Sequence, residues 1–241
     1  SIKIMMNSLY GCMANRWFRY YNRDVAEAIT MSGQLSIRWA EKVANSLLNE
    51  KLETKGFDYV IAIDTDSIYL NLESLVQKMN LPESEIENAL DDYCENVIKP
   101  ELAKGYEALA AYMGAYKNRM VMEREVIARR GIWLAKKRYI LDVLNSEGVH
   151  YDHPELKVMG VEAVKSSTPA VCRKAYRKLF EVILRTDEKQ TQKALAVFKE
   201  EFEKLPVEDI SFPRGVSSVS KYYDPKTIYR KGTPIHVRGS L

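Results

Sequence analysis

The spacing of apolar residues changes several times along the chain, and each change marks a new kind of element. Residues 2–15 are rich in helix formers, and residues 24–50 place apolar side chains at helical intervals, so both stretches predict helices. No capping residue precedes the first helix, so we expect the chain to begin inside it. Residues 60–63 and 68–72 are short apolar runs on either side of Asp-Thr-Asp, and they predict a strand hairpin.

Further strands and helices follow downstream. Residues 83–98 predict an acidic helix that Pro100 interrupts. Residues 120–127 and 132–143 predict strands on either side of the sequence ARRG, and Asn145-Ser-Glu-Gly predicts a hairpin turn.

The last third is predicted to be mainly helical. Thr168 is expected to be the N-cap, and Pro169 the first residue, of a helix that ends near residue 185. Residue 187 or 188 begins another helix. The mixture of strands and helices predicts the α+β class.

Composition narrows the class of protein. Of the 241 residues, 46% are hydrophobic, which suffices for a sizeable core and argues against disorder. No apolar run approaches the roughly 20 residues of a membrane span, so no membrane association is expected. Cys12, Cys94 and Cys172 lie far apart, so we expect ordinary core thiols in a reducing compartment.

Charge is unevenly distributed although the net charge is only +3. Residues 81–111 carry eight acids against two lysines, whereas residues 117–178 carry fourteen Lys or Arg against seven acids. Residues 214–238 carry six basic residues and one acid. A charge run is more often a solvated face than a binding site, so the pattern alone makes a polyanion only one candidate partner.

Two carboxylates, Asp64 and Asp66, lie one residue apart at the tip of the predicted hairpin. Carboxylates held close together need a counter-charge, and Mg²⁺ binds one or two carboxylates together with substrate phosphates. A plain surface turn is the alternative. A haloacid-dehalogenase-like phosphatase is a weaker alternative, because Ile68 stands where Thr or Val is usual and the only downstream acidic pair, Asp91-Asp92, lies in a helical stretch.

Three motifs in order resemble those of family B DNA polymerases, nearest to the replicative enzymes of T-even-type bacteriophages. Residues 3–11, KIMMNSLYG, resemble the fingers helix; residues 64–67, DTDS, resemble the palm hairpin; residues 136–139, KKRY, resemble a primer-template grip. The segments WFRYY, KVMGVEAVKSSTP and HVRG also look like the phage branch, so the resemblance covers essentially the whole chain.

The resemblance implies a division into fingers, palm and thumb segments, and it implies that the chain is part of a larger enzyme. Residues 1–16 would end the fingers, residues 17–160 would form the carboxyl-terminal part of the palm with an antiparallel sheet carrying the hairpin and packed helices, and residues 161–241 would form part of a mainly helical thumb. No stretch matches the other palm motif, DxxSLYP, which supplies the family's third carboxylate. We therefore expect a fragment of a DNA-directed DNA polymerase that is inactive alone, with a non-catalytic DNA-binding fragment as the alternative.

The resemblance also implies roles and partners. Lys3 would contact the incoming dNTP, Tyr10 would pack under the nascent base pair, and Asp64 and Asp66 would bind Mg²⁺. Primer-template DNA and an upstream polypeptide carrying the exonuclease domain and the rest of the palm and fingers would be partners. A sliding clamp is a further candidate, and the cytoplasm of the infected bacterium the expected location. The remaining implied contacts are Asn7, Ser8 and Gly11 for the nucleotide, and Lys136, Lys137, Arg138, Tyr139, Lys165, Arg173 and Lys174 for DNA.

Some positions keep alternatives or depart from the family. Taken singly, Lys3 would suit an exposed helix face, Tyr10 a core position and KKRY a basic strand end. Glu123 and Glu125 resemble palm acids near the primer terminus. Family members usually have glycine where Ile63 precedes the first aspartate, so the geometry at the primer terminus is in question.

Overall fold

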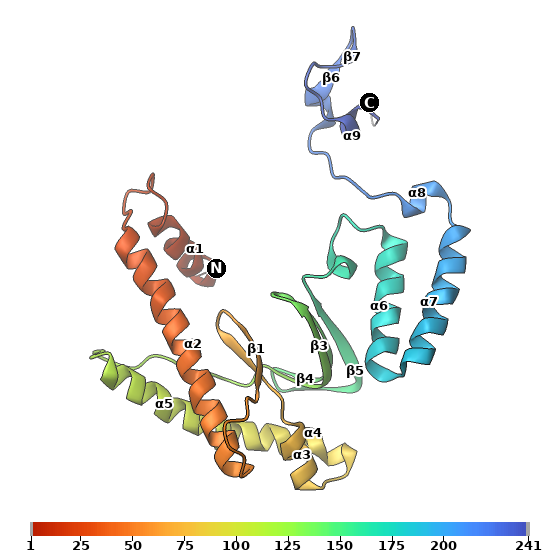
Figure 1. Cartoon of the computed structure of the whole chain (residues 1–241). Coiled ribbons are helices and arrows are strands. Elements are labelled where there is room, and N and C mark those ends of the chain that lie inside the picture. Colours follow the sequence, from red (N-terminus) through yellow and green to blue (C-terminus); the bar gives the residue numbers. More distant parts are fainter. Residues whose placement is uncertain (1, 240–241) are drawn as a thin grey trace. The chain divides into compact units, whose positions relative to one another are not determined.

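The computed structural model describes residues 2–239, and of residues 3 and 7 the backbone alone. Helices alternate with small sheets along the chain (Figure 1), so the predicted α+β class is confirmed. The chain divides into two compact units. The first comprises the residues up to 129 with 143–154, and the second comprises 130–142 with the residues from 155 onward.

The first unit begins with two predicted helices. α1 (Ile2–Met13) ends two residues before its predicted end, and α2 (Arg23–Lys51) exceeds its predicted range by one residue at each end. Asn22 caps α2, because its side chain accepts a hydrogen bond from the Val25 N–H at 3.1 Å.

A second helical stretch packs against α2. α4 (Glu83–Tyr93), the π-helical turn η1 (Cys94–Ile98) and α5 (Lys99–Tyr112) follow one another without a break. The predicted interruption at Pro100 is therefore wrong. The wider π-helical turn directly before Pro100 accommodates the missing N–H and the ring that would clash in a regular helix.

Small residues let α2 and α5 approach closely. Ala40 and Ala44 of α2 are each only 1% exposed and belong to the same core as Leu102 of α5. A Cβ added to Gly105 of α5 would lie 2.7 Å from a Val43 methyl group of α2, so the contact requires glycine.

The predicted hairpin rests on this core. β1 (Val60–Asp64) pairs antiparallel with β2 (Ser67–Leu70), and buried Val60 joins the α2–α5 core. α3 (Glu73–Met79), which the sequence did not predict, follows directly. Its Leu75 packs in a smaller cluster with residues of α4 and of the sheet described next.

Three strands form the largest sheet, in the order β3 (Val126–Ala135), β4 (Arg138–Ser146) and β5 (Val149–Met159). The predicted break at ARRG is wrong, because β3 continues through it. Packing rather than a turn requires glycine at position 131, because an added Cβ would lie 2.7 Å from the Leu141 side chain. The predicted turn before β5 is confirmed.

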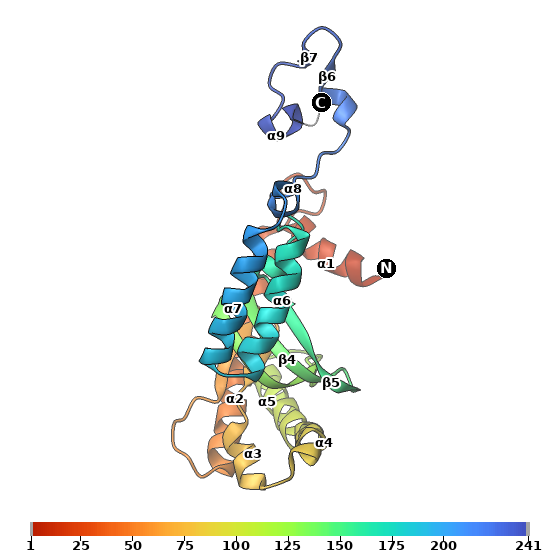
Figure 2. The same cartoon turned by 90° about the vertical axis from the view of Figure 1, so that its right-hand side faces the viewer.

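One helix packs against this sheet within the second unit, and a second helix packs on the first. α6 (Ala170–Arg185) contributes Leu184 to a core with Ile140 and Val158, and Figure 2 shows α7 (Glu188–Glu203) beside α6. Both predicted helices are confirmed, but the predicted N-cap is shifted by one residue. Pro169 holds that position, and no side chain caps the helix.

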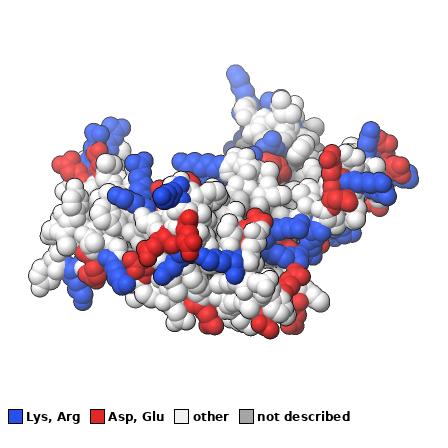
Figure 3. Space-filling view, turned by 60° about the horizontal axis from the view of Figure 1, so that its bottom comes forward, with Lys and Arg blue, Asp and Glu red and all other residues white. Residues whose placement is uncertain are grey.

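Short elements complete the described chain: α8 (Val207–Ile210), the 3-10 turn η3 (Val219–Tyr222), β6 (Tyr223–Asp224), β7 (Ile228–Tyr229) and α9 (Ile235–Arg238). Within residues 2–239, no helix combines the length and apolar character that crossing a membrane requires. On the face shown in Figure 3, basic and acidic side chains are interspersed, so the charge runs of the sequence do not form a single-sign surface there.

Candidate active site and nucleic-acid interface

The tip of the β1–β2 hairpin presents the two predicted carboxylates. Asp64 pairs with Ser67 across the hairpin, and Thr65 takes a left-handed conformation with φ +57°. The Asp66 N–H donates to the Asp64 carbonyl at 2.7 Å, and the Ser67 hydroxyl donates to the same oxygen at 3.1 Å. These bonds fix a tight turn that places both aspartates at one end of the hairpin.

The two carboxylates differ in their surroundings. Asp64 is half-buried and accepts a hydrogen bond from the Thr65 hydroxyl at 3.0 Å. Asp66 is exposed, and its carboxylate forms no hydrogen bond or ion pair with the side chains that the structure describes. Ile63, which replaces the family's glycine, is 38% exposed on the strand. An apolar side chain thus lies directly beside the acidic tip.

The donor set of the tip could hold a divalent metal ion only together with ligands from elsewhere. Among the described residues, no three His, Cys, Asp or Glu side chains gather where they could hold a metal ion. Asp64 and Asp66 provide two carboxylates, which are hard oxygen ligands of the kind that Mg²⁺ binds together with phosphates and water. Further ligands would have to come from substrate or from another carboxylate.

The fingers-like motif lies on α1. The side chains of Lys3 and Asn7 are outside the described residues, so their predicted contacts remain untested. Ser8 and Gly11 are exposed, and a Cβ added to Gly11 would meet no atom of the described chain within 4 Å. Tyr10 is 41% exposed, which does not fit a core aromatic.

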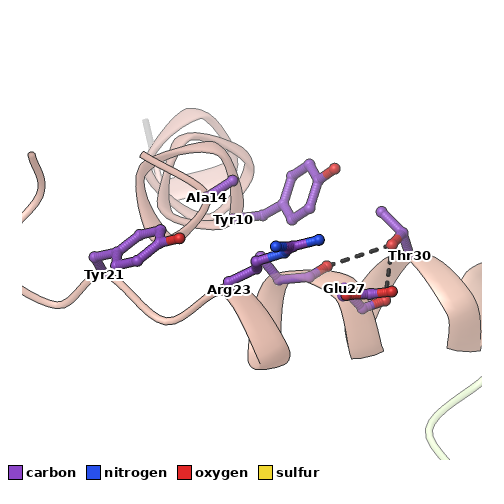
Figure 4. A pocket seen from close by; sticks show the side chains of 7 residues that line it. Tyr10, Ala14, Tyr21, Arg23, Glu27 and Thr30 are labelled. Atoms are coloured by element: carbon purple, nitrogen blue, oxygen red, sulfur yellow. Dashed lines mark hydrogen bonds between the residues drawn. The ribbon is translucent and has the colours of Figure 1, made fainter. Parts of the chain in front are cut away.

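Tyr10 borders an open pocket of about 350 Å³ between α1 and α2. In Figure 4, Tyr10, Tyr21 and Arg23 lie around this space, while the Thr30 hydroxyl turns back to donate to the Glu27 carbonyl at 2.7 Å. The pocket therefore offers aromatic faces and one guanidinium. Its lining residues are Tyr10, Ala14, Tyr21, Arg23, Ala26, Glu27 and Thr30.

The acids before β3 are not placed in one cluster with the hairpin tip. Glu123 lies 3.9 Å from the Lys99 ammonium and is 72% exposed. Arg124 between the two acids is 12% exposed and binds Asp91 at 2.5 Å, and it also donates to buried Asn145. Asp91, one of the pair that the phosphatase alternative needs, therefore has a structural partner. The predicted strand over residues 120–127 begins only at residue 126.

KKRY spans the turn between β3 and β4 and the first two residues of β4, and is called the KKRY turn below. Lys136 and Lys137 are exposed at the turn, and Lys137 has a φ of +62°. Arg138 is also exposed, at the first position of β4. Tyr139 is only 7% exposed, and its ring centre lies 6.4 Å from that of Trp133. Two cations in the turn and one at the start of β4 are thus exposed to solvent, beside a buried tyrosine.

The other predicted DNA contacts lie after β5. Lys165 forms an ion pair with Glu162 at 2.8 Å, and Glu162 also lies 3.6 Å from Arg138. Glu162 was not among the residues predicted for the site. The only local signal was its position three residues before Lys165. Arg173 and Lys174 lie near the beginning of α6, where Lys174 is exposed and Arg173 half-buried.

Comparisons with known proteins agree with the motifs. The sequence profile of DNA polymerase family B matches residues 1–227. The chain is 35% identical to the DNA-directed DNA polymerase of Escherichia phage RB69 and 33% identical to that of Enterobacteria phage T4, in each case over 99% of this chain and 28% of the relative. DNA polymerase 1 of Pyrococcus abyssi is 26% identical over 85% of this chain and 21% of the relative. The chain thus spans less than a third of the length of these relatives.

Proposed function

The chain belongs to DNA polymerase family B, and on this basis we propose that it forms part of an enzyme that joins a dNTP to a primer 3′-hydroxyl under the direction of a template. The observation that carries the proposal is the acidic hairpin tip, within a chain similar over 99% of its length to two phage DNA-directed DNA polymerases. The infected bacterial cell is the expected setting.

The nucleotide would meet the α1 face. Lys3 would contact the triphosphate, with Asn7 and Ser8 shaping the same side of the nucleotide pocket. Tyr10 would pack under the nascent base pair, and Gly11, which has no side chain and open space around it, would let the backbone come close there. A lysine ammonium suits this task because it acts as a point charge toward phosphate.

Asp64 and Asp66 would hold the divalent cation at the primer terminus. When bound, Mg²⁺ offsets the charge on the phosphates and on the attacking and leaving oxygens. The exposed Asp66 carboxylate is the more available ligand, and Asp64 is oriented by Thr65.

DNA phosphates would meet the cations of the second unit. Lys136, Lys137 and Arg138 are exposed at the turn and at the start of β4, and they would contact backbone phosphates, which carry no sequence information. Tyr139 would support the turn from inside. The candidates for the adjoining contacts are Lys165, Arg173 and Lys174.

The chain is proposed to need a second polypeptide segment. Residues 1–16, 17–160 and 161–241 would be fingers, palm and thumb segments, respectively, and no DxxSLYP motif occurs among them. The third carboxylate, the exonuclease domain and the rest of the palm and fingers would come from the upstream part of the polymerase. A sliding clamp is a further candidate partner.

Binding of a labelled primer-template duplex across a salt series tests the DNA-binding part. We expect affinity to fall with salt, and substitution of Lys136, Lys137 and Arg138 by alanine to make the slope of log Kd against log salt shallower by about 2–3, since each phosphate contact contributes about 0.9. Alanine at three exposed α7 lysines, Lys189, Lys193 and Lys199, is the charge-matched control and should leave most of the slope. A folded wild-type chain that binds no DNA would contradict the proposal.

A further inference from the structure

Glu162 lies among the cations that are proposed to bind DNA. It begins the 3-10 turn η2 (Glu162–Val164) that follows β5. One of its carboxylate oxygens, Oε1, lies 2.8 Å from Lys165 Nζ and 3.6 Å from Arg138 Nη2. A single acid thus joins a cation of the KKRY turn to a cation 27 positions later in the chain.

Packing holds Glu162 in this position. The residues on either side of it, Val161 and Ala163, are 3% and 4% exposed and belong to the core of the second unit. Gly160 has a φ of +67°, and an added Cβ would lie 2.1 Å from the Lys137 carbonyl oxygen. The segment therefore lies tightly against the KKRY turn. The packing of the neighbouring residues fixes the position of the Glu162 backbone.

The carboxylate is charged, and the cluster is open to solvent. The hydrogen bond from Lys165 lowers the pKa of Glu162, and the charge of Arg138 acts in the same direction. The side chains of Glu162, Lys165 and Arg138 are 54%, 42% and 45% exposed, so an incoming anion can reach them. An exposed ion pair is weak, so its replacement by another anion is not prohibitive.

We propose that Glu162 is a built-in competitor of DNA phosphate, which occupies Lys165 and Arg138 in the free chain and must give them up when DNA binds. A phosphate that bridged the two cations would take the donors that Oε1 now faces, and the displaced carboxylate would repel it at short range. Glu162 would thereby weaken DNA binding and speed release. The inference rests on the proposed DNA-binding function.

Replacement Glu162→Gln keeps the size of the side chain and removes its charge. With the same primer-template duplex at about 50 mM salt, we expect the variant to bind about three- to tenfold more tightly and to dissociate more slowly, with the difference shrinking as salt screens the charges. Glu200→Gln on α7 is the control, because it removes the same charge from an exposed site in the same unit. It should change the affinity for DNA by less than about twofold.

A double-mutant cycle shows whether the competition acts through Lys165. In a Lys165→Gln background, Glu162→Gln should give a clearly smaller gain than in the wild type. Unchanged or weaker binding by Glu162→Gln, or a gain equal to that of Glu200→Gln, would overturn the competitor role while salt-dependent binding by the wild type leaves the DNA-binding proposal standing. Absence of binding by both wild type and Glu162→Gln, each shown to be folded by circular dichroism, would overturn both.

Discussion

Three acidic side chains show how neighbours decide what a carboxylate can do. Asp142 is fully buried and bound by Arg185 at 2.8 Å, so it has a structural role. Glu162 is exposed but paired with Lys165, so an incoming anion has to replace it. Asp66 is exposed and has no partner among the described side chains, so it remains available to a cation.

Cys94 should be an unreactive thiol. Burial raises its pKa to about 11, and the nearby charges of Asp91 and Glu95 contribute in the same direction against the opposing effect of Arg124. Since only the thiolate reacts, iodoacetamide at pH 8 should modify Cys94 about a hundredfold more slowly in the folded chain than in urea. Burial of the neutral thiol stabilises the fold below the unfolded pKa, and this contribution is lost as the pH rises toward 11.

Peptide mapping by mass spectrometry gives the modification rate of Cys94 separately from those of the other two cysteines. A Cys94→Ser chain identifies the peptide. Equal rates for Cys94 in the folded and unfolded chains would contradict the burial that the structure shows.

At the scale of elements, Gly160 should be essential to the junction between β5 and the KKRY turn. Alanine there would combine a left-handed backbone with a Cβ 2.1 Å from the Lys137 carbonyl oxygen. We expect Gly160→Ala to lower the free energy of unfolding by about 3–4 kcal/mol, the sum of the left-handed strain and the overpacking.

Gly148 offers a matched control for Gly160. Its φ is +85°, but an added Cβ would meet nothing within 4 Å, so Gly148→Ala should cost only about 1–2 kcal/mol of left-handed strain. Urea unfolding followed by circular dichroism compares the two variants. Equal losses would mean that the close approach to Lys137 does not limit stability.

The two partners of the ion pair between Asp142 of β4 and Arg185 of α6 should differ in how much their replacement lowers the free energy of unfolding. Arg185→Gln leaves the buried Asp142 carboxylate without its main counter-charge and should lower the free energy of unfolding by about 3 kcal/mol. Asp142→Asn removes the Asp142 charge from beside Arg185, but water can reach the Arg185 side chain because it is already 32% exposed. This replacement should therefore lower the free energy of unfolding by about half as much. Fluorescence of Trp133, in a chain with Trp17 and Trp39 replaced by Phe, reports on this unit. A larger loss for Asp142→Asn would contradict the argument.

Local signals predicted the elements that local chemistry controls. The acidic hairpin and α2 followed from turn residues and apolar spacing, and both are confirmed. The strand through ARRG was missed because Gly131 serves a contact with Leu141, ten positions away, and not a turn. The pairing of Glu162 with Arg138 likewise depends on two segments that the sequence alone does not bring together.

At the scale of the whole molecule, the proposed two-metal reaction needs more metal ligands than the described residues bring together. The chain covers 28% of the phage relatives, and its described residues contain one pair of candidate metal-binding carboxylates without a third acidic ligand beside them. Two-metal phosphoryl transfer requires more ligands than that pair provides. The cations proposed to bind DNA need no further metal ligand, so DNA binding and catalysis should be separable in this chain.

The purified chain should therefore extend no primer by itself, with either Mg²⁺ or Mn²⁺. Gel analysis of a labelled primer measures this, with the Asp66→Asn chain as the control for contaminating polymerase. Extension that Asp66→Asn abolishes would contradict the need for a further carboxylate, whereas equal extension by both chains would indicate a contaminant. Addition of a polypeptide that carries the amino-terminal remainder of a similar phage polymerase should restore extension, and that extension should be lost with Asp66→Asn because the hairpin would then supply one of the shared metal ligands.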